Sequence, residues 1–560
     1  MRPTRPATLT TLTVLAALAS LAGLPGCGDG SAPAADATAS KGQVRPATSQ
    51  AKVSFYAASR FAEQATFGPT PALVAELQAK GFEAWIDEQF ALPPTTIDSQ
   101  PARINGNPIP RAPYDYQGVQ AAKLMLTAPD QLRTRVAWSI GQWIVVSGTK
   151  PHPVGTIEWI NSLQRWAFGT YGELLYNVSI HPTMGQFLDN IQNRPKSAEC
   201  PSCAPNENYA RELMQLFSIG VLKLNADGTP VKNSRGGFIE TYAQKDVEEL
   251  ARVLTGWTYF ADPFGGDNFS THYYHPMIPT TWPPQRDSGQ KTVLGRVFPA
   301  GQSQEKDLRD AVELLSRHAN AAPFVALRLI QHLVKSNPTP AYVGRVAAVY
   351  RNNGQGVVGD MRALVKAVLL DAEARAGDVP GQGRSDDGKI REPVLWRTAV
   401  ARSMGCTLLP YTDSTDQQTS IPAQPPWWPE SVFSFYAPTD RAPGSNLLAP
   451  EQGLLVATEL TRRLSELNWR TQGGGITIDQ AYFSRKGCSL EALVKAFGDS
   501  PRAFSDLLAQ QYFRGAMPPT LRVNLEQLIV ASPELAASPD YGALRMLQFA
   551  LSTPYFGVIQ

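Results

Sequence analysis

The sequence lacks most features that identify the common enzyme and nucleic-acid-binding classes. It has no Gly-x-Ser-x-Gly motif and no phosphate-binding glycine loop, which argues against serine hydrolysis and nucleotide chemistry. Its 51 Lys and Arg residues nearly balance 49 Asp and Glu residues, and no basic block is interleaved with aromatics, so nucleic acid is not an expected partner. Beyond residue 50, no apolar run approaches the ~20 residues of a membrane-spanning helix.

The N-terminus is the one long apolar part of the chain. Two arginines precede an apolar run over residues 9–24, and a cysteine, Cys27, follows it. A basic start, a run too short to cross a bilayer and small residues before a cysteine are typical of a signal peptide with a lipobox-like end. We therefore expect residues 1–27 to direct export and Cys27 to be acylated. Pro25 is unusual at its place, and ordinary cleavage near Gly26 or an uncleaved anchor are the alternatives.

The region after the signal peptide divides into a tether and one large domain. Residues 28–54 are rich in Ala, Ser, Thr and Pro, so they have too little apolar surface to fold and we expect a flexible tether. Residues 55–560 contain no second linker of this kind and no repeat of fixed period, which predicts a single helical domain. We expect an exported protein, periplasmic or an outer-membrane lipoprotein, that meets the membrane only through its lipid anchor.

Four cysteines remain once Cys27 is set aside. Cys200 and Cys203 are three residues apart, which fits a tight disulfide, part of a metal site, a redox pair or free thiols. A four-cysteine zinc site usually has two close pairs, whereas Cys406 and Cys488 are isolated from each other. A disulfide between Cys200 and Cys203 is therefore the favoured interpretation.

Helical signals dominate the domain. Thr70 and Pro71 precede an i, i+3, i+4 apolar stripe of Leu73, Val74 and Leu77, which predicts a helix with a capping hydroxyl and a first-turn proline. The same apolar period predicts helices over residues 82–90, 130–147, 156–168, 170–179, 207–220, 244–257, 306–318, 322–335, 340–352, 359–372, 392–404, 451–467, 489–498, 503–511, 521–531 and 541–551.

The remaining segments predict little β structure. Residues 219–241 read as strand and turn, with the turn at Asp227-Gly228. Three long stretches rich in Gly, Pro and polar residues are expected to be ordered loops, because two of them also carry many aromatics; they are 258–303, 374–390 and 407–448. The predicted fold class is mainly α, a large multi-helix globular domain with one short β-hairpin and long ordered loops.

The densest polar constellation begins at Asn206. If Asn206 caps a helix, Glu207 and Arg211 lie four residues apart on one face, and Asn208 and Glu212 form a second pair of the same spacing. This arrangement places two carboxylates and two amides around one helix start.

A second polar segment begins at Asp246. Glu248 and Arg252 lie four residues apart in the favourable acid-first order, and Gly256 is expected to end the helix. The two segments thus repeat one arrangement of acids and arginines.

These two segments have a catalytic and a structural interpretation. In the catalytic one, Glu207, Glu212 or Asp246 acts as a general base or as a ligand of a divalent metal. Substrate binding then falls to Asn206, Asn208, Arg211 and Arg252. In the structural one, the acids pair with the two arginines in a buried network that joins two helices to tight turns, because buried charges must be paired.

Other residues leave two interpretations open. His181 fits a ring at a helix end that donates to a carbonyl, or a catalytic base or ligand facing the Asn206 motif. His272 and His275 fit metal binding or a stacked or solvated loop pair. The aromatic segment 427–436 fits a packing anchor for its long loop, or a face that stacks on sugars or binds a partner.

The polar segments are also where the chain resembles a known family. Residues 206–220 and 242–257 resemble the two core motifs of the domain of unknown function 1800 family. Further stretches that resemble it are 61–68, 71–90, 181–190, 291–295, 431–436 and 547–560, so the resemblance covers nearly all of the predicted domain. Many members have a Trp-His-Asn-His pattern where this chain reads Trp138-Ser139-Ile140-Gly141-Gln142-Trp143, so no metal role is carried over to those positions.

The resemblance implies a mainly helical, exported protein without a settled activity. Genes of this family often neighbour those of the domain of unknown function 1501 family, whose members resemble alkaline phosphatases and sulfatases, so such a protein is an expected partner. We therefore predict a binding or assembly component of the cell envelope that acts with an envelope partner. The alternative prediction is a metal-dependent periplasmic hydrolase centred on Glu207, Glu212, Asp246 and His181.

Overall fold

Local sequence signals begin and end the helices much as predicted. Thr70 accepts a hydrogen bond from the Leu73 N–H at 3.2 Å, Pro71 opens the first turn, and Gly81, at φ +80°, ends the helix. A hydroxyl cap followed by proline recurs at Thr339 and at Ser500. These starts satisfy backbone N–H groups that the first helical turn leaves unpaired.

The computed structural model describes residues 52–99, 103–104, 107–108, 114–151, 153–260, 273–384, 386–410, 421–465, 471–472, 477–478 and 480–559. Its α-helices are α1 Phe55–Ala65, α2 Pro71–Lys80, α3 Phe82–Ala91, α4 Tyr114–Thr127, α5 Gln131–Ile140, α6 Pro153–Trp166, α7 Tyr171–Ser179, α8 Pro182–Phe187, α9 Asn208–Gln215, α10 Gln244–Val253, α11 Gln304–Ser316, α12 Ala321–Leu333, α13 Pro340–Arg351, α14 Met361–Leu370, α15 Ala372–Arg375, α16 Pro393–Ser403, α17 Ala457–Ser465, α18 Gln480–Arg485, α19 Glu491–Asp499, α20 Pro501–Tyr512, α21 Pro519–Ala531, α22 Pro533–Ala536 and α23 Pro539–Leu551. The strands are β1 Arg103–Ile104, β2 Asn107–Pro108, β3 Trp257–Thr258, β4 Ile278–Pro279, β5 Lys291–Val293, β6 Arg296–Phe298, β7 Lys389–Ile390, β8 Thr471–Gln472, β9 Thr477–Ile478 and β10 Val558–Ile559, and 3₁₀ turns cover Pro283–Gln285 and Pro450–Leu454.

The mainly α fold class is confirmed. The described strands form only two-stranded antiparallel pairs, such as β5 with β6 inside the long loop that precedes α11. At the predicted turn, Gly228 has φ +81° and the Asn225 N–H donates to the Thr229 carbonyl at 2.8 Å. Isolated antiparallel bridges such as Leu222 with Glu240 continue that hairpin.

Helix α1 was not predicted, although Ala58, Phe61, Ala62 and Ala65 form an apolar stripe at i, i+3, i+4 and i+7. Its N-cap is Ser54, whose side chain accepts from the Ala57 N–H. The buried residues of α1 also include the polar Ser59, Arg60, Glu63 and Gln64. Polar residues lie inside this helix because partners from distant segments meet them.

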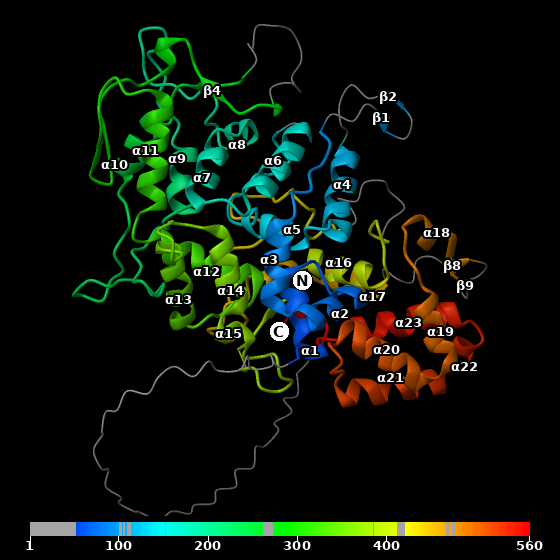
Figure 1. Ribbon diagram of the computed structural model, residues 1–560. Helices are drawn as coiled ribbons and strands as arrows, with labels where there is room; N and C mark the ends of the chain where they lie inside the picture. Colours follow the sequence, from blue (N-terminus) through cyan, green and yellow to red (C-terminus); the bar gives the residue numbers. More distant parts are fainter. Residues whose placement is uncertain are drawn as a thin grey trace, which may run out of the picture. The chain divides into compact units, whose positions relative to one another are not determined.

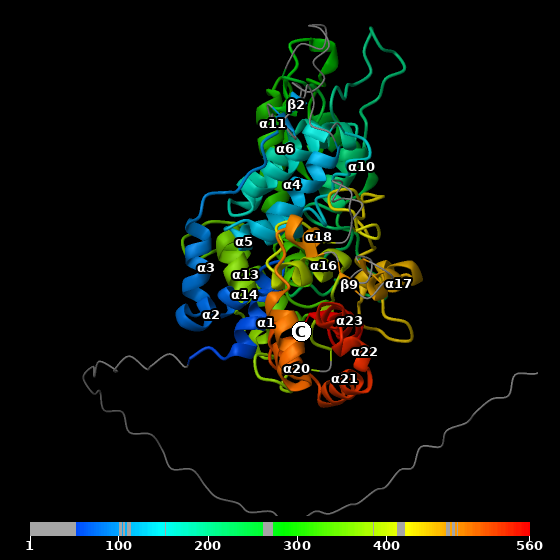
Figure 2. The ribbon, with the colours of Figure 1, turned by 90° about the vertical axis from the view of Figure 1, so that its right-hand side faces the viewer.

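Helices distant in sequence lie side by side within the compact unit Lys52–Gln560. Helix α12 packs against α13, α14 and α5, and α10 packs against α9, α11 and β5 (Figure 1). Helices α19 to α23 pack on one another, as both views show (Figure 2). Strand β10 pairs with β7 and contacts α1, so the last described residues meet the first helix. No described helix is long and apolar enough to span a membrane.

Buried ion pairs join segments that are far apart in the chain. Glu63 on α1 accepts from Arg391 and from Arg514, each at 2.8 Å, and all three side chains are buried. Burial raises the pKa of Glu63, but Arg514 and Arg391 outweigh it and hold that pKa below its ordinary value. The pair of Arg397 and Glu459, at 2.7 Å, similarly joins α16 to α17.

The predictions for the first 51 residues fall outside the described part of the chain. These are the signal peptide 1–27, acylation of Cys27 and nearly all of the tether 28–54. They stay predictions.

Two disulfides are present among the described residues. Cys200 and Cys203 are bonded, as favoured from their spacing, with an S–S distance of 1.99 Å. Cys406 and Cys488 are bonded as well, at 2.03 Å, although the sequence analysis treated them as isolated. This second disulfide could have been predicted, because two cysteines remained unassigned in a chain that is expected to be exported to an oxidising compartment.

Removing the second disulfide should be costly. Replacing both Cys406 and Cys488 by serine should lower the free energy of unfolding by about 2–5 kcal/mol, because the bond closes a loop between residues 82 apart. The matched control, serine at both Cys200 and Cys203, should lose clearly less because that loop spans three residues. Urea unfolding of the oxidised proteins measures both, and equal losses would contradict the prediction.

Candidate functional site

The Asn206 motif begins helix α9, and its amides serve the backbone. Asn206 accepts a hydrogen bond from the Asn208 N–H at 2.9 Å, but the N-cap of α9 is Glu207, so Asn206 lies one residue before the cap position that was predicted for it. Its own N–H donates to the Asn193 side chain at 2.7 Å. The Asn208 side chain donates to Asp189 at 3.1 Å rather than meeting Glu212. Both amides are therefore engaged within the protein.

Glu207 belongs to a three-membered polar cluster between α9 and α10. It pairs with Arg211 at 2.9 Å and accepts from Gln244 at 2.8 Å, while Arg211 also donates to Gln244 at 3.1 Å. The Glu207 and Arg211 side chains are 36% and 40% exposed, so solvent screens the pair and it adds little stability. The cluster orients α9 against α10.

Glu212 is the acid of this motif that the fold leaves unsatisfied. Its Oε2 atom is buried and has no hydrogen-bond partner among the described residues. Burial raises the pKa of Glu212, and nearby Arg211 only partly opposes this. A carboxylate in this state is the one feature of the motif that fits proton transfer.

Asp246 fastens the β5–β6 hairpin to the start of α10. One carboxylate oxygen accepts from the Ala243 N–H at 2.9 Å, which caps the helix. The other accepts from the Leu294 N–H, at 2.7 Å, in the turn of the hairpin. Both oxygens are therefore used by backbone donors that would otherwise lack partners.

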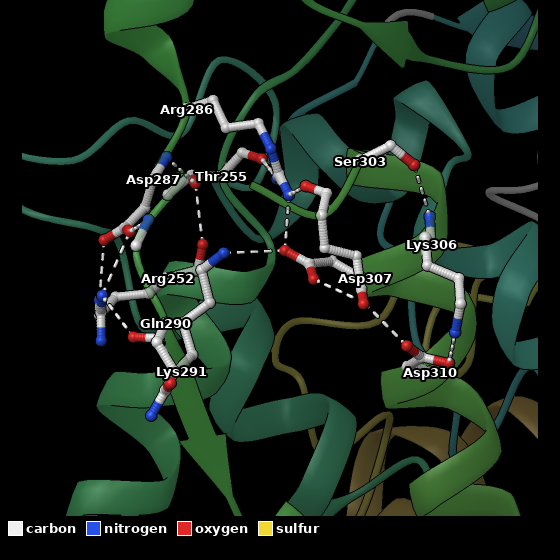
Figure 3. A network of polar contacts seen from close by, with 12 residues as sticks. Arg252, Thr255, Arg286, Asp287, Gln290, Lys291, Ser303, Lys306, Asp307 and Asp310 are labelled. Carbon is white, nitrogen blue, oxygen red and sulfur yellow. Dashed lines mark hydrogen bonds and ion pairs between the residues drawn. The ribbon is translucent and has the colours of Figure 1, made fainter. Parts of the chain in front are cut away.

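Arg252 does not pair with Glu248, contrary to the expected i, i+4 contact. Its guanidinium instead binds Asp287 at 2.7 Å (Figure 3) and Glu249 at 2.9 Å. Glu248 faces Lys245 at 3.5 Å. Asp287 comes from the loop before β5 and supplies a second carboxylate on this side of the helix. The tertiary contact with Asp287 therefore determines that Arg252 pairs with Glu249 and not with Glu248.

The network continues to α11 through buried charges. Asp307, fully buried, accepts from Arg286 at 2.5 Å and from Lys291 at 2.8 Å (Figure 3). Gln302 bridges Asp307 and Asp310, at 2.9 and 2.8 Å. The acids and arginines around Arg252 thus join α10, the hairpin and α11, which is the arrangement of the structural interpretation.

His181 lies at the start of α8, apart from the acidic motif. Its Nδ1 accepts from the Thr183 N–H at 3.2 Å, and its ring packs edge-on against Trp159. Burial lowers the pKa of His181 to about 4, although a hydrogen bond to the Glu158 backbone opposes this. No hydrogen bond or ion pair of the described chain joins His181 to Glu207, Glu212 or Asp246. Their joint catalytic role stays a hypothesis.

The described residues of this region do not form a metal-binding site. Within the described ranges, no group of three His, Cys, Asp or Glu side chains is placed to hold a metal ion. His275 packs on Phe260, and His272 lies outside the described residues.

A buried polar cluster that the sequence analysis missed surrounds Glu392. Its carboxylate accepts from Trp138 at 3.3 Å, from Gln424 at 2.7 Å and from the Tyr436 hydroxyl at 3.1 Å. Burial raises the pKa of Glu392, but nearby Lys389 and the other partners lower it below its ordinary value. The position of Glu392 just before Pro393, at a helix start, gave no hint of these partners.

The aromatic segment 427–436 packs over this cluster. The Trp427 ring meets Trp138 edge-on with centroids 5.3 Å apart. Gly141 makes room for it, since a Cβ there would lie 2.4 Å from the Trp427 ring. These contacts favour the packing anchor, while Phe433, 46% exposed, leaves an outward face.

A small pocket opens beside the cluster, and it too was missed. It has a volume of about 30 Å³ and is lined by Gln142, Trp143, Arg328, His332 and Tyr436, among others. The available signal was the pair Arg328 and His332, one helical turn apart in helix α12, whose other residues apart from Gln331 are apolar.

The structural role of Asp246 predicts a loss of stability on its replacement. Asp246→Asn should lower the free energy of unfolding by about 1–3 kcal/mol, because an amide NH₂ cannot accept from both backbone donors. Glu248→Gln is the control and should change it by less than about 0.5 kcal/mol, because Glu248 is exposed. Urea unfolding measures the free energy of unfolding of both variants. An Asp246→Asn protein as stable as wild type would contradict the structural interpretation.

Comparison with known proteins gives one match. The family model described as "Protein of unknown function (DUF1800)" matches residues 60–558, nearly the whole chain and all the sites above. No curated protein and no solved structure matches significantly. The family model spans both polar segments, the aromatic segment and the helices between them. The chain therefore belongs to the DUF1800 family of proteins of unknown function.

Proposed function

We propose that this protein is a binding or assembly component of the bacterial cell envelope that acts with an envelope partner. The observation that carries the proposal is that two of the three acids expected to be catalytic, Glu207 and Asp246, are used by the fold. Glu207 meets Arg211 and Gln244, and Asp246 meets two backbone N–H groups. A general base or metal ligand needs an accessible lone pair, and these carboxylates already accept from protein donors.

Export rests on the N-terminal sequence. The basic start, the apolar run over 9–24 and the cysteine at 27 support a signal peptide and a lipid anchor, and the segment to residue 54 supports a tether. Such an anchor would hold the helical domain at the periplasmic or outer-membrane surface, where it can meet an envelope partner.

The hollow between α7 and α11 supports binding. It has a volume of about 760 Å³ and is lined by aromatic and charged side chains, including Trp166, Glu173, Tyr176, Arg309 and Glu313. The Arg309 guanidinium lies over the Tyr176 ring at 4.2 Å. Aromatic and arginine side chains are enriched at the energetic centres of protein interfaces. We therefore place the partner contact in this hollow.

The partner we propose is a phosphatase-like or sulfatase-like protein of the domain of unknown function 1501 family. Co-expressed with a protein of that family, the wild-type chain should co-purify with it. The double variant Tyr176→Ala with Arg309→Ala should bind at least about tenfold more weakly, since such residues are typical hot spots. Lys495→Ala, at an exposed site on α19, is the control. Failure of the wild type to bind would refute this partner, and equal binding by the double variant would refute the hollow as the interface.

The second candidate is a metal-dependent periplasmic hydrolase centred on the Asn206–Glu212 motif. It is favoured by Glu212, whose buried oxygen has no partner among the described residues. Elemental analysis of the exported protein, purified without chelator, separates the two functions. The binding proposal predicts no stoichiometric metal and no hydrolysis of nitrophenyl phosphate or sulfate. A metal that is stoichiometric in wild type and lost in a folded Glu212→Gln variant would instead establish the hydrolase.

A further inference from the structure

Arg328 is a half-buried cation that lines a small pocket and has no acidic partner there in the part of the chain that the structure describes. Its guanidinium donates to Gln331 at 3.3 Å and lies over the Phe324 ring at 5.3 Å, but among the described residues it forms no ion pair. Burial lowers the pKa of Arg328 to about 10, and the only nearby titratable group that opposes this is the Tyr171 phenol. A half-buried cation without a carboxylate would be stabilised by a ligand that supplies the anion.

His332 lies one turn further along α12 and lines the same pocket. Its ring stacks on Trp143 with centroids 5.6 Å apart, and neither ring nitrogen has a hydrogen-bond partner within the described chain. Burial, together with the positive charges of Lys389, Arg328 and Arg135, holds the pKa of His332 well below its ordinary value. The ring is therefore neutral and has one N–H free to donate.

The charges around the pocket do not balance. Lys389 pairs with Glu451 at 3.0 Å, and Arg135 lies in the field of Glu392 and Glu451. Those two carboxylates offset Lys389 and Arg135, so the charge of Arg328 is left over. One monoanion placed against Arg328 would restore neutrality.

The shape of the pocket limits what that anion can be. Since roughly 10–15 Å³ of such space holds one water molecule, a volume of about 30 Å³ admits a group of two or three heavy atoms. Its outer walls are apolar and include Leu216, Val432 and the half-exposed Phe433. A phosphate dianion would need more space and a second free cation.

We propose that this pocket binds the carboxylate of a ligand with an apolar stem, with Arg328 as the cationic partner and His332 as a second donor. A carboxylate matches the planar fork of a guanidinium. The stem would leave the pocket past Val432 and Phe433. This site is separate from the hollow between α7 and α11 and does not depend on the envelope partner.

Histidine NMR on the full mature protein tests the proposal. The chain has six histidines, so ¹³C-histidine labelling gives few resonances, and the one absent from a His332→Gln variant reports on the pocket. Titration with butyrate should shift that resonance saturably, while butyramide and chloride should leave it unchanged. Arg328→Met, which keeps an apolar stem but removes the charge, should weaken butyrate binding at least about tenfold. Arg317→Met, at a 61% exposed site, is the control and should bind as wild type does.

A second ligand distinguishes the two possible sources of the carboxylate. Tighter binding of N-acetylleucine than of butyrate would point to the C-terminus of a polypeptide, and equal binding to a free small carboxylate. Either result supports a carboxylate site. A wild-type resonance that does not respond to butyrate, an equal response to chloride, or full butyrate affinity in a folded Arg328→Met protein would overturn the proposal.

Discussion

The pairing of buried charges is the constraint on which this structure depends. Removing a charge from water costs several kcal/mol, and the cost is offset only where an opposite charge and hydrogen bonds replace the water. Glu63 shows the consequence, because it holds α1 to Arg391 and Arg514, which lie 328 and 451 residues further along the chain. Four polar residues of α1 are buried, and the charged ones among them need distant partners of this kind. The ends of the domain are thus fastened by charge as well as by apolar packing.

The acidic motif follows the same rule. Arg252 meets Glu249 and Asp287, Asp307 meets Arg286 and Lys291, and the α10–hairpin–α11 region forms around these contacts (Figure 3). The features that make this region resemble an active site in sequence are therefore features that assemble it. Glu212 and Arg328 break the rule in opposite senses: one is a buried acid whose oxygen lacks a donor, the other a cation without an acid. Functional chemistry is best sought at such exceptions.

Local signals in the sequence predicted most of the helices, though not, for example, α1, α4 or α8, and did not predict the contacts between helices. Thr70 and Pro71 begin α2 because capping and first-turn geometry depend on neighbouring residues alone. The partner of Arg252 could not be predicted, because Asp287 lies 35 residues away and reaches it through a loop. The pocket at Arg328 and His332 was detectable in principle, since these residues and Gln331 interrupt a mostly apolar helix. The pattern alone does not say that Arg328 lacks an acid.

The central claim is that paired interior charges hold the fold, whereas the charge of Arg328 is left free for a ligand. The most direct measurement compares the free energy of unfolding of Glu63→Gln and Arg328→Met without ligand. Glu63→Gln should lose about 3 kcal/mol or more, because it leaves two buried guanidinium groups with a weakened partner. Arg328→Met should stay within about 1 kcal/mol of wild type or exceed it, because an unpaired cation is removed. A loss in Arg328→Met as large as that in Glu63→Gln would contradict the account.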